Sequence, residues 1–141
     1  KPVPYNPYNI KNQRWGEALV AGAGPLTNLF IALIFGFLIR IGGGSGLFSP
    51  EFIALAAVVA YINILLAIFN MIPIPPLDGS KVLMSLIPYH LQGPFRQFEA
   101  MFAGAGFFGL VLFLFAFIYI FSKPFSILVG YVFILITGMS L

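Results

Sequence analysis

The strongest structural pattern in this chain lies in residues 51–83, EFIALAAVVAYINILLAIFNMIPIPPLDGSKVL. Residues 52–77 contain no Lys, Arg, Asp or Glu, and this run exceeds the roughly 20 residues that a membrane-spanning helix needs. Three prolines within residues 73–76 remove amide donors, so a span over residues 52–72 cannot continue as a regular helix. The apolar pattern persists past these prolines, which predicts non-helical backbone at membrane depth, held inside protein or against a wet cavity.

Two further apolar runs of spanning length flank this stretch and predict transmembrane helices over residues 18–40 and 98–121. The apolar tail, residues 124–141, has only 18 residues and two internal glycines, so it is either a short fourth span or a re-entrant segment. The predicted fold is an all-α polytopic membrane protein in which residues 1–141 form a single membrane domain.

The composition agrees with this class of protein. Sixty per cent of the 141 residues are apolar and 8% are charged, whereas soluble domains carry about 25% charged residues, so a water-soluble surface cannot be built. Basic residues lie at the predicted span ends, where they would face the head groups of the lipid bilayer. The net charge of +3 therefore does not indicate a nucleic-acid partner. The absence of cysteine excludes disulfides and thiolate metal sites.

The connecting segments also have readable patterns. Three prolines within residues 1–15 forbid a helix and predict an extended interfacial strand or hairpin. The small residues at positions 21–24 would let a neighbouring helix approach the first span closely. Four glycines, two serines and a proline predict a loop at residues 41–50, and a short helix is expected at residues 80–87.

The distribution of basic residues predicts the orientation. If the three spans alternate, five basic residues share one side and two the other, which puts the amino-terminal segment in the cytoplasm. The five are Lys1, Lys11, Arg14, Lys81 and Arg96, and the two are Arg40 and Lys123.

Asp78 is the only aspartate, and it lies at the end of the proline-broken apolar run. A charged group at the centre of a span costs about 2.5 to 3.5 kcal/mol on insertion scales, so it should have a partner. One interpretation is that Asp78 caps the following helix and pairs with Lys81. The other is that it binds a cation or transfers protons.

Two amides, Asn28 and Asn70, lie inside the first and second predicted spans. Amides in spans usually find partners on neighbouring helices, so both could simply tie helices together. The functional alternative is that Asn28, Asn70 and Asp78 converge on one polar pocket.

Three separated segments together resemble the site-2 protease family of intramembrane zinc metalloproteases. They are KPVPYNPYNIKNQRWGEALV at residues 1–20, AGPLTN at 23–28 and FNMIPIPPLDGSKVL at 69–83, in the order found in that family. In this family an upstream span carries HExxH, whose histidines bind zinc and whose glutamate is the general base. The resemblance implies hydrolysis of peptide bonds in or near the transmembrane segments of membrane protein or peptide substrates.

The resemblance also assigns roles to residues of this chain. It implies that Asp78 is the third protein ligand of Zn²⁺, and that Asn28 lies near the active site and supports the oxyanion. Asn70 and Pro73 resemble the segment that faces the substrate, and the extended segment at residues 2–9 resembles an edge strand that pairs with it. The resemblance further suggests a bacterial inner (cell) membrane location.

The sequence departs from the family pattern in one respect, because it contains no HExxH and His90 is its only histidine. The chain starts at Lys1, so we expect it to begin within a longer protein, and by itself it should be inactive. Two other classes of protein remain open. A transporter fragment with a proline-broken helix would couple ions without zinc, and a non-catalytic membrane scaffold would need Asp78 only for stability.

Overall fold

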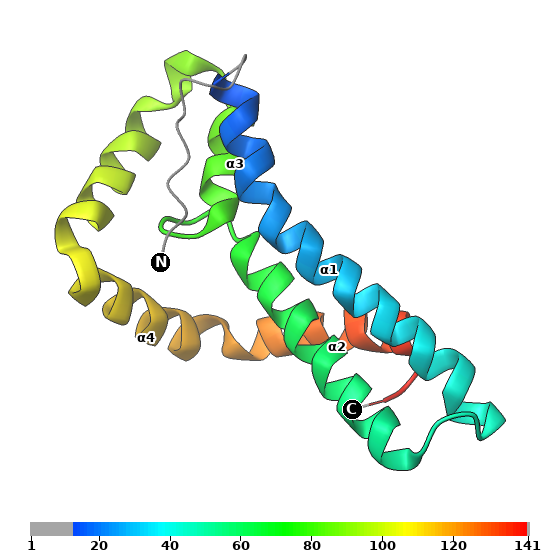
Figure 1. Ribbon diagram of the computed structural model, residues 1–141. Coiled ribbons are helices and arrows are strands. Elements are labelled where there is room, and N and C mark those ends of the chain that lie inside the picture. The colour runs from blue at the N-terminus through cyan, green and yellow to red at the C-terminus, as the bar shows by residue number, and fades with distance from the viewer. Residues whose placement is uncertain (1–12, 141) are drawn as a thin grey trace.

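The computed structural model describes residues 13–140, and every element within them is a helix (Figure 1). The side chains of residues 13 and 14 are not described. The elements are α1 (Gln13–Ser45), α2 (Pro50–Asn70), α3 (Asp78–Leu86), the short 3-10 helix η2 (Tyr89–Leu91) and α4 (Gly93–Thr137).

Three of these helices contain segments long and apolar enough to cross a membrane: Trp15–Gly43, Pro50–Asn70 and Gly93–Thr137. This confirms the prediction of an all-helical integral membrane protein. The prediction that the extended segment reaches residue 15 is wrong, because α1 already begins at Gln13. The remainder of the predicted strand, residues 1–12, lies outside the described part of the chain.

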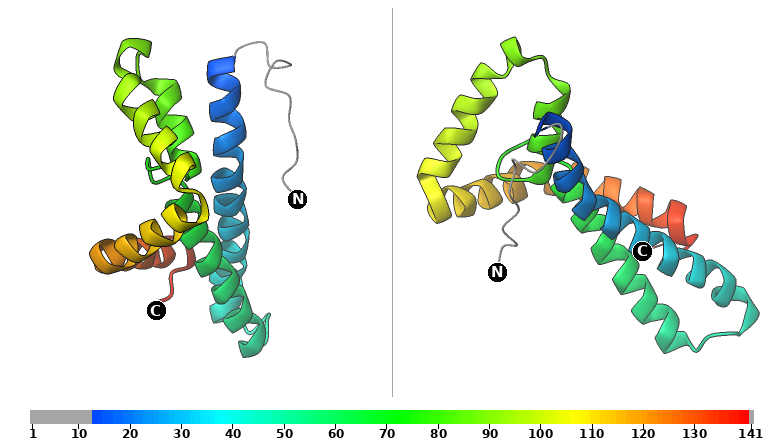
Figure 2. Two further views of the ribbon diagram at one scale, coloured as in Figure 1. Left: turned by 90° about the vertical axis from the view of Figure 1, so that its left-hand side faces the viewer. Right: turned by 45° about the horizontal axis from the view of Figure 1, so that its top comes forward.

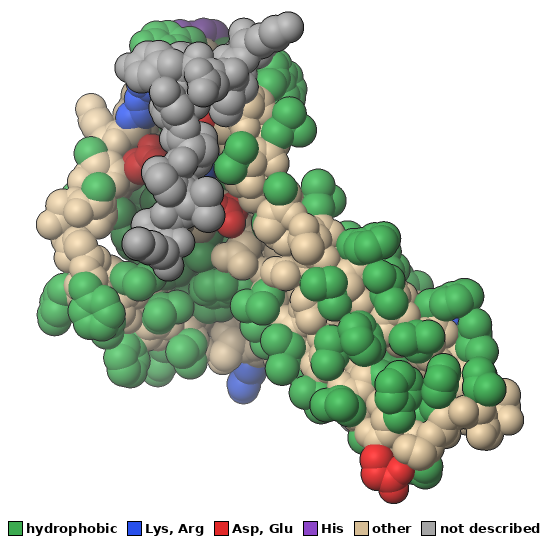
Figure 3. All heavy atoms as spheres, viewed as in Figure 1, with side chains coloured by type: hydrophobic (Ala, Val, Ile, Leu, Met, Phe, Trp, Pro, Cys, Tyr) green, Lys and Arg blue, Asp and Glu red, His purple; other side chains and the backbone are tan. Residues whose placement is uncertain are grey.

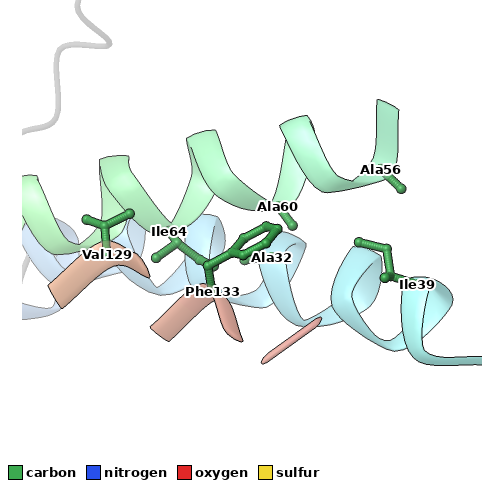
Figure 4. Packing of buried hydrophobic residues seen from close by; sticks show 7 residues of the cluster. All are labelled: Ala32, Ile39, Ala56, Ala60, Ile64, Val129 and Phe133. Carbon is green, nitrogen blue, oxygen red and sulfur yellow. The ribbon is translucent and has the colours of Figure 1, made fainter. Parts of the chain in front are cut away.

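The core forms where α1 and α2 pair as a hairpin and the end of α4 packs against them (Figure 4). Small side chains on α1 and α2 let the two backbones approach, and larger side chains of α4 fill the space beside them. Phe133 is only 2% exposed, and its ring meets that of Tyr61 edge to face at 5.9 Å. The buried cluster consists of Ala32, Ile39, Ala56, Ala60, Ile64, Val129 and Phe133.

Arg40 fixes the end of α4 against α1. Its guanidinium donates hydrogen bonds to the carbonyl oxygens of Leu135 at 2.6 Å and Ile136 at 2.9 Å. These carbonyls belong to the last turn of α4, where the helix dipole is negative and a cation is stabilising. Gly138 then ends the helix in the left-handed conformation, with a φ of 75°.

The structure does not separate the carboxy-terminal third at the expected boundary between a span at residues 98–121 and a tail at residues 124–141. The helix α4 runs through Pro124, and its break lies instead at Gly106, where φ is 53° and ψ is −138°. Proline inside a helix removes one backbone hydrogen bond, but α4 continues through Pro124, whereas the backbone at Gly106 suits only glycine. The end of α4 lies against the α1–α2 pair, whereas the residues on both sides of this break project away from it (Figures 1 and 2).

Two smaller expectations change with these boundaries. The loop predicted at residues 41–50 is shorter, because α1 continues through the glycines to Ser45. Lys123 lies within α4 rather than at its end. The orientation of the chain remains a prediction.

The predicted helix break after α2 is confirmed. The helix ends at Asn70, and the proline-rich backbone at residues 71–77 turns sharply before α3 begins. Within this connection the Ile74 amide donates to the Ile72 carbonyl at 2.8 Å, and the Leu77 amide donates to the Ile74 carbonyl at 3.0 Å. The chain is thereby returned onto α1, against which α3 packs.

Candidate functional site

Asp78 lies at the point where α3 meets α1. It is the first residue of α3 and is half-buried. A methyl group placed on Gly24 of α1 would lie 3.8 Å from the Oδ2 atom of Asp78, so the carboxylate faces the small-residue patch of α1. The amino-terminal end of α3 stabilises a negative charge at this position.

The carboxylate of Asp78 has no protein partner within residues 13–140, where it takes part in neither a hydrogen bond nor an ion pair. The interpretation that Asp78 caps α3 is wrong, because the cap position is Leu77 and no side chain caps this helix. The expected pairing with Lys81 is also absent from this part of the chain. No side chain of residues 13–140 thus competes with a cation for the oxygens of Asp78.

Gly79 holds the beginning of α3 against the end of α2. A methyl group on Gly79 would lie 2.6 Å from the carbonyl oxygen of Ile72 and closer still to that of Met71. Both neighbours are backbone atoms, which cannot move aside as a flexible side chain can. The PLDG sequence thus brings Asp78 next to the turn that follows Asn70 because no side chain separates the two backbones.

The two amides are placed on the helices that flank Asp78. Asn28 lies four residues after Gly24 on α1, which is one helical turn further along the same face. Asn70 is the last residue of α2, and both side chains are half-buried. In the described part of the chain neither amide makes a hydrogen bond, so the expected ties between helices are not present there. Convergence of Asn28 and Asn70 with Asp78 in one pocket remains a prediction.

Pro73 lines a different feature, an apolar groove of about 690 Å³ between α1, the end of α2 and α3. The groove walls include Leu26 and Leu29 of α1 and Ile68 of α2. Asn28, Asn70 and Asp78 do not line it, so the structure does not place Pro73 in the same cavity as the polar residues.

The described residues do not form a complete metal site by themselves. Residues 13–140 contain no group of three His, Cys, Asp or Glu side chains that could hold an ion. His90 is exposed on η2, as expected for a histidine outside the site. The unpartnered carboxylate of Asp78 fits a role as one oxygen ligand, and a catalytic zinc site would need two more protein ligands.

The sequence reasoning missed the structural roles of Gly24 and Gly79. The small-residue patch predicted a close approach to α1, but it did not identify α3 and its carboxylate as the neighbour. A glycine directly after the acidic residue was the available signal for the contact at Gly79.

Residues 39–114 match the model of Peptidase family M50, the family that contains the site-2 proteases. This match covers more than half of the chain and includes Asn70, Pro73 and Asp78. The chain belongs to Peptidase family M50. The resemblance seen in the sequence is thereby confirmed.

Several M50 relatives carry zinc metalloprotease names. "Putative zinc metalloprotease YwhC" of Bacillus subtilis (strain 168) is 30% identical over 123 residues, which cover 84% of this chain and 53% of that protein. "Putative zinc metalloprotease MJ0611" of Methanocaldococcus jannaschii is 44% identical over 66 residues, which cover 45% of this chain and 31% of that protein. The M50 chain thus spans about half the length of YwhC and less of MJ0611. No solved structure matches it.

Proposed function

We propose that this chain is the part of an intramembrane zinc metalloendopeptidase that supplies Asp78 as one of three protein ligands of Zn²⁺. The observation that carries the proposal is the half-buried carboxylate of Asp78, which faces Gly24 and has no partner among residues 13–140. Family membership and the names of the relatives support zinc as the metal. The two histidines of an HExxH motif would come from outside the 141 residues, since the only histidine here is His90.

The proposed reaction is hydrolysis of a peptide bond in or near a transmembrane segment of a substrate. Zinc, when bound, supplies Lewis-acid catalysis and a nucleophile at neutral pH. Asp78 would hold the metal as an anionic oxygen ligand, oriented by the amino-terminal end of α3 and by the packing of Gly79. Asn28 would donate its amide to the oxygen on which negative charge develops.

The neighbouring features suggest how a substrate would be held. Pro73 has no amide hydrogen, and it lines the apolar groove between α1 and α2. An apolar substrate segment would lie in this groove, with Asn70 at the end of α2 beside the scissile region. Non-helical backbone at membrane depth is tolerated where it lines such a cavity.

The proposal is tested with the longer natural polypeptide, if the coding sequence upstream of Lys1 contains an HExxH span. We expect about one zinc per chain by inductively coupled plasma mass spectrometry, and cleavage of a model transmembrane substrate in lipid vesicles. Asp78→Asn keeps the side-chain shape and removes the charge. It should weaken zinc binding by more than about 100-fold, because even partners outside the first ligand shell contribute 10–100-fold.

Asn28→Ala separates the two proposed roles. It should lower the cleavage rate by about 10²–10³-fold while zinc content stays unchanged, as expected for loss of one donor to the oxyanion. Glu51→Gln, at the opposite end of α2, is the matched control and should change neither measurement. Zinc content that is unaffected by Asp78→Asn would refute the ligand assignment, and ion transport without cleavage would favour a transporter.

A further inference from the structure

A second cavity lies at the end of the molecule where α1 begins, away from the core. It has a volume of about 520 Å³ and is formed by the start of α1, by α3, by η2 and by the start of α4. This volume is in the range of about 300–1,000 Å³ that is typical of small-molecule sites. Its polar lining residues include Glu17, Lys81, Tyr89, Gln92, Arg96 and Glu99.

The charges in this cavity are balanced but not paired with one another. Glu17 and Glu99 contribute two carboxylates, and Lys81 and Arg96 contribute two cations. Within the described residues, no ion pair joins any of them. Most of the charged side chains visible in Figure 3 gather around this end of the molecule, whereas hydrophobic side chains cover the α1–α2 hairpin.

Arg96 is held in a fixed position by neutral groups. Its guanidinium donates to the Oε1 atom of Gln92 at 3.0 Å and lies over the ring of Tyr89, 5.2 Å from the ring centre. Gln92 is only 6% exposed, and its amide donates to the carbonyls of Met84 and Ile87 at 3.0 and 3.1 Å. The guanidinium is therefore oriented before any ligand binds, which lowers the entropic cost of binding an anion.

The cavity lies beside the first residues of two helices that are long and apolar enough to cross a membrane. The apolar segments Trp15–Gly43 and Gly93–Thr137 both begin beside it. Trp15 is 51% exposed and Tyr89 is 74% exposed, and aromatic residues of these two types are enriched at membrane interfaces.

We propose that this cavity binds the head group of phosphatidylethanolamine. Arg96 and Lys81 would bind the phosphate, and Glu17 and Glu99 would accept hydrogen bonds from the primary ammonium. The balance of two acids and two bases fits a zwitterion better than a purely anionic lipid. A choline head group has no N–H donor for the carboxylates, so it should bind more weakly. This inference does not depend on the proposed protease activity.

The test is native mass spectrometry of the full 141-residue chain, exchanged into micelles with equimolar phosphatidylethanolamine, phosphatidylcholine and phosphatidylglycerol. We expect retention of phosphatidylethanolamine about tenfold above that of phosphatidylcholine, as for one additional charged hydrogen bond. Soluble phosphoethanolamine in a parallel sample should compete only weakly, because it lacks the acyl chains. Preference for the soluble compound over the lipid would overturn the lipid assignment.

Two variants of Glu99 provide a sharper test, because this side chain makes no hydrogen bond or ion pair within residues 13–140. Glu99→Gln should remove most of the tenfold preference, and Glu99→Lys should shift retention toward the anionic phosphatidylglycerol. Lys123→Gln, on an exposed part of α4 that does not line the cavity, is the matched control. Circular dichroism melting checks that each variant folds. Equal retention of the ethanolamine and choline lipids, or an unchanged ratio in folded Glu99→Gln, would overturn the proposal.

Discussion

Replacement of Gly79 by alanine should destabilise the junction between α2 and α3. The added methyl would lie 2.6 Å from the carbonyl oxygen of Ile72 and closer to that of Met71, so one backbone segment must shift. Overpacking costs about 1–3 kcal/mol, and the upper end applies because the neighbours are backbone atoms. Alanine recovers up to about 1 kcal/mol of helix propensity in α3. The expected net loss is about 2 kcal/mol in the free energy of unfolding.

The measurement is reversible unfolding in mixed micelles, with SDS as denaturant and helicity followed by circular dichroism. Gly22→Ala is the matched control, because a methyl group at Gly22 of α1 has no neighbour within 4 Å. This control should be neutral or stabilising by up to about 1 kcal/mol. If Gly79→Ala is as stable as the unmodified protein, or if both variants lose the same stability, the argument from close backbone approach fails.

Three further substitutions test the packing of the remaining helices by the same unfolding assay. Arg40→Met removes both hydrogen bonds to the end of α4 and should cost about 3 kcal/mol, with Lys123→Met as a control that should change little. Phe133→Ala empties the space between α4 and the hairpin and should also cost about 3 kcal/mol, whereas Phe107→Ala, at a position 81% exposed, should be near neutral. Ser49→Ala removes the side-chain acceptor of the Phe52 amide and should cost about 1 kcal/mol, and unchanged stability would show that this cap contributes nothing.

The sequence predicted the parts of the fold that depend on local chemistry. The length of the apolar runs was sufficient to identify the helices that could span a membrane. The prolines between α2 and α3 lack amide donors, which was sufficient to predict that the helix ends before them. The sequence did not place the bend in the last helix, because α4 runs through Pro124 and bends at Gly106. Glycines also lie at positions 104 and 109, and the sequence does not reveal which of the three takes a positive φ.

The candidate site was predicted less completely. Asp78 follows an apolar run, which identified it as an acidic residue that is costly to place in a membrane. Among residues 13–140, the structure shows neither capping of α3 by Asp78 nor an ion pair between Asp78 and Lys81. The approach of α3 to Gly24 joins residues more than fifty positions apart, and no local pattern encodes such a contact. The sequence contains no HExxH motif, so it carries no local pattern from which the geometry of a complete zinc site could be predicted.

The hydrogen bonds of Arg40 to the end of α4 have a consequence for biogenesis. The two partners are separated by about 95 positions, so the guanidinium must enter the membrane region long before the ribosome has synthesised its acceptors. We expect the newly made α1–α2 hairpin to keep Arg40 near the lipid head groups until α4 arrives.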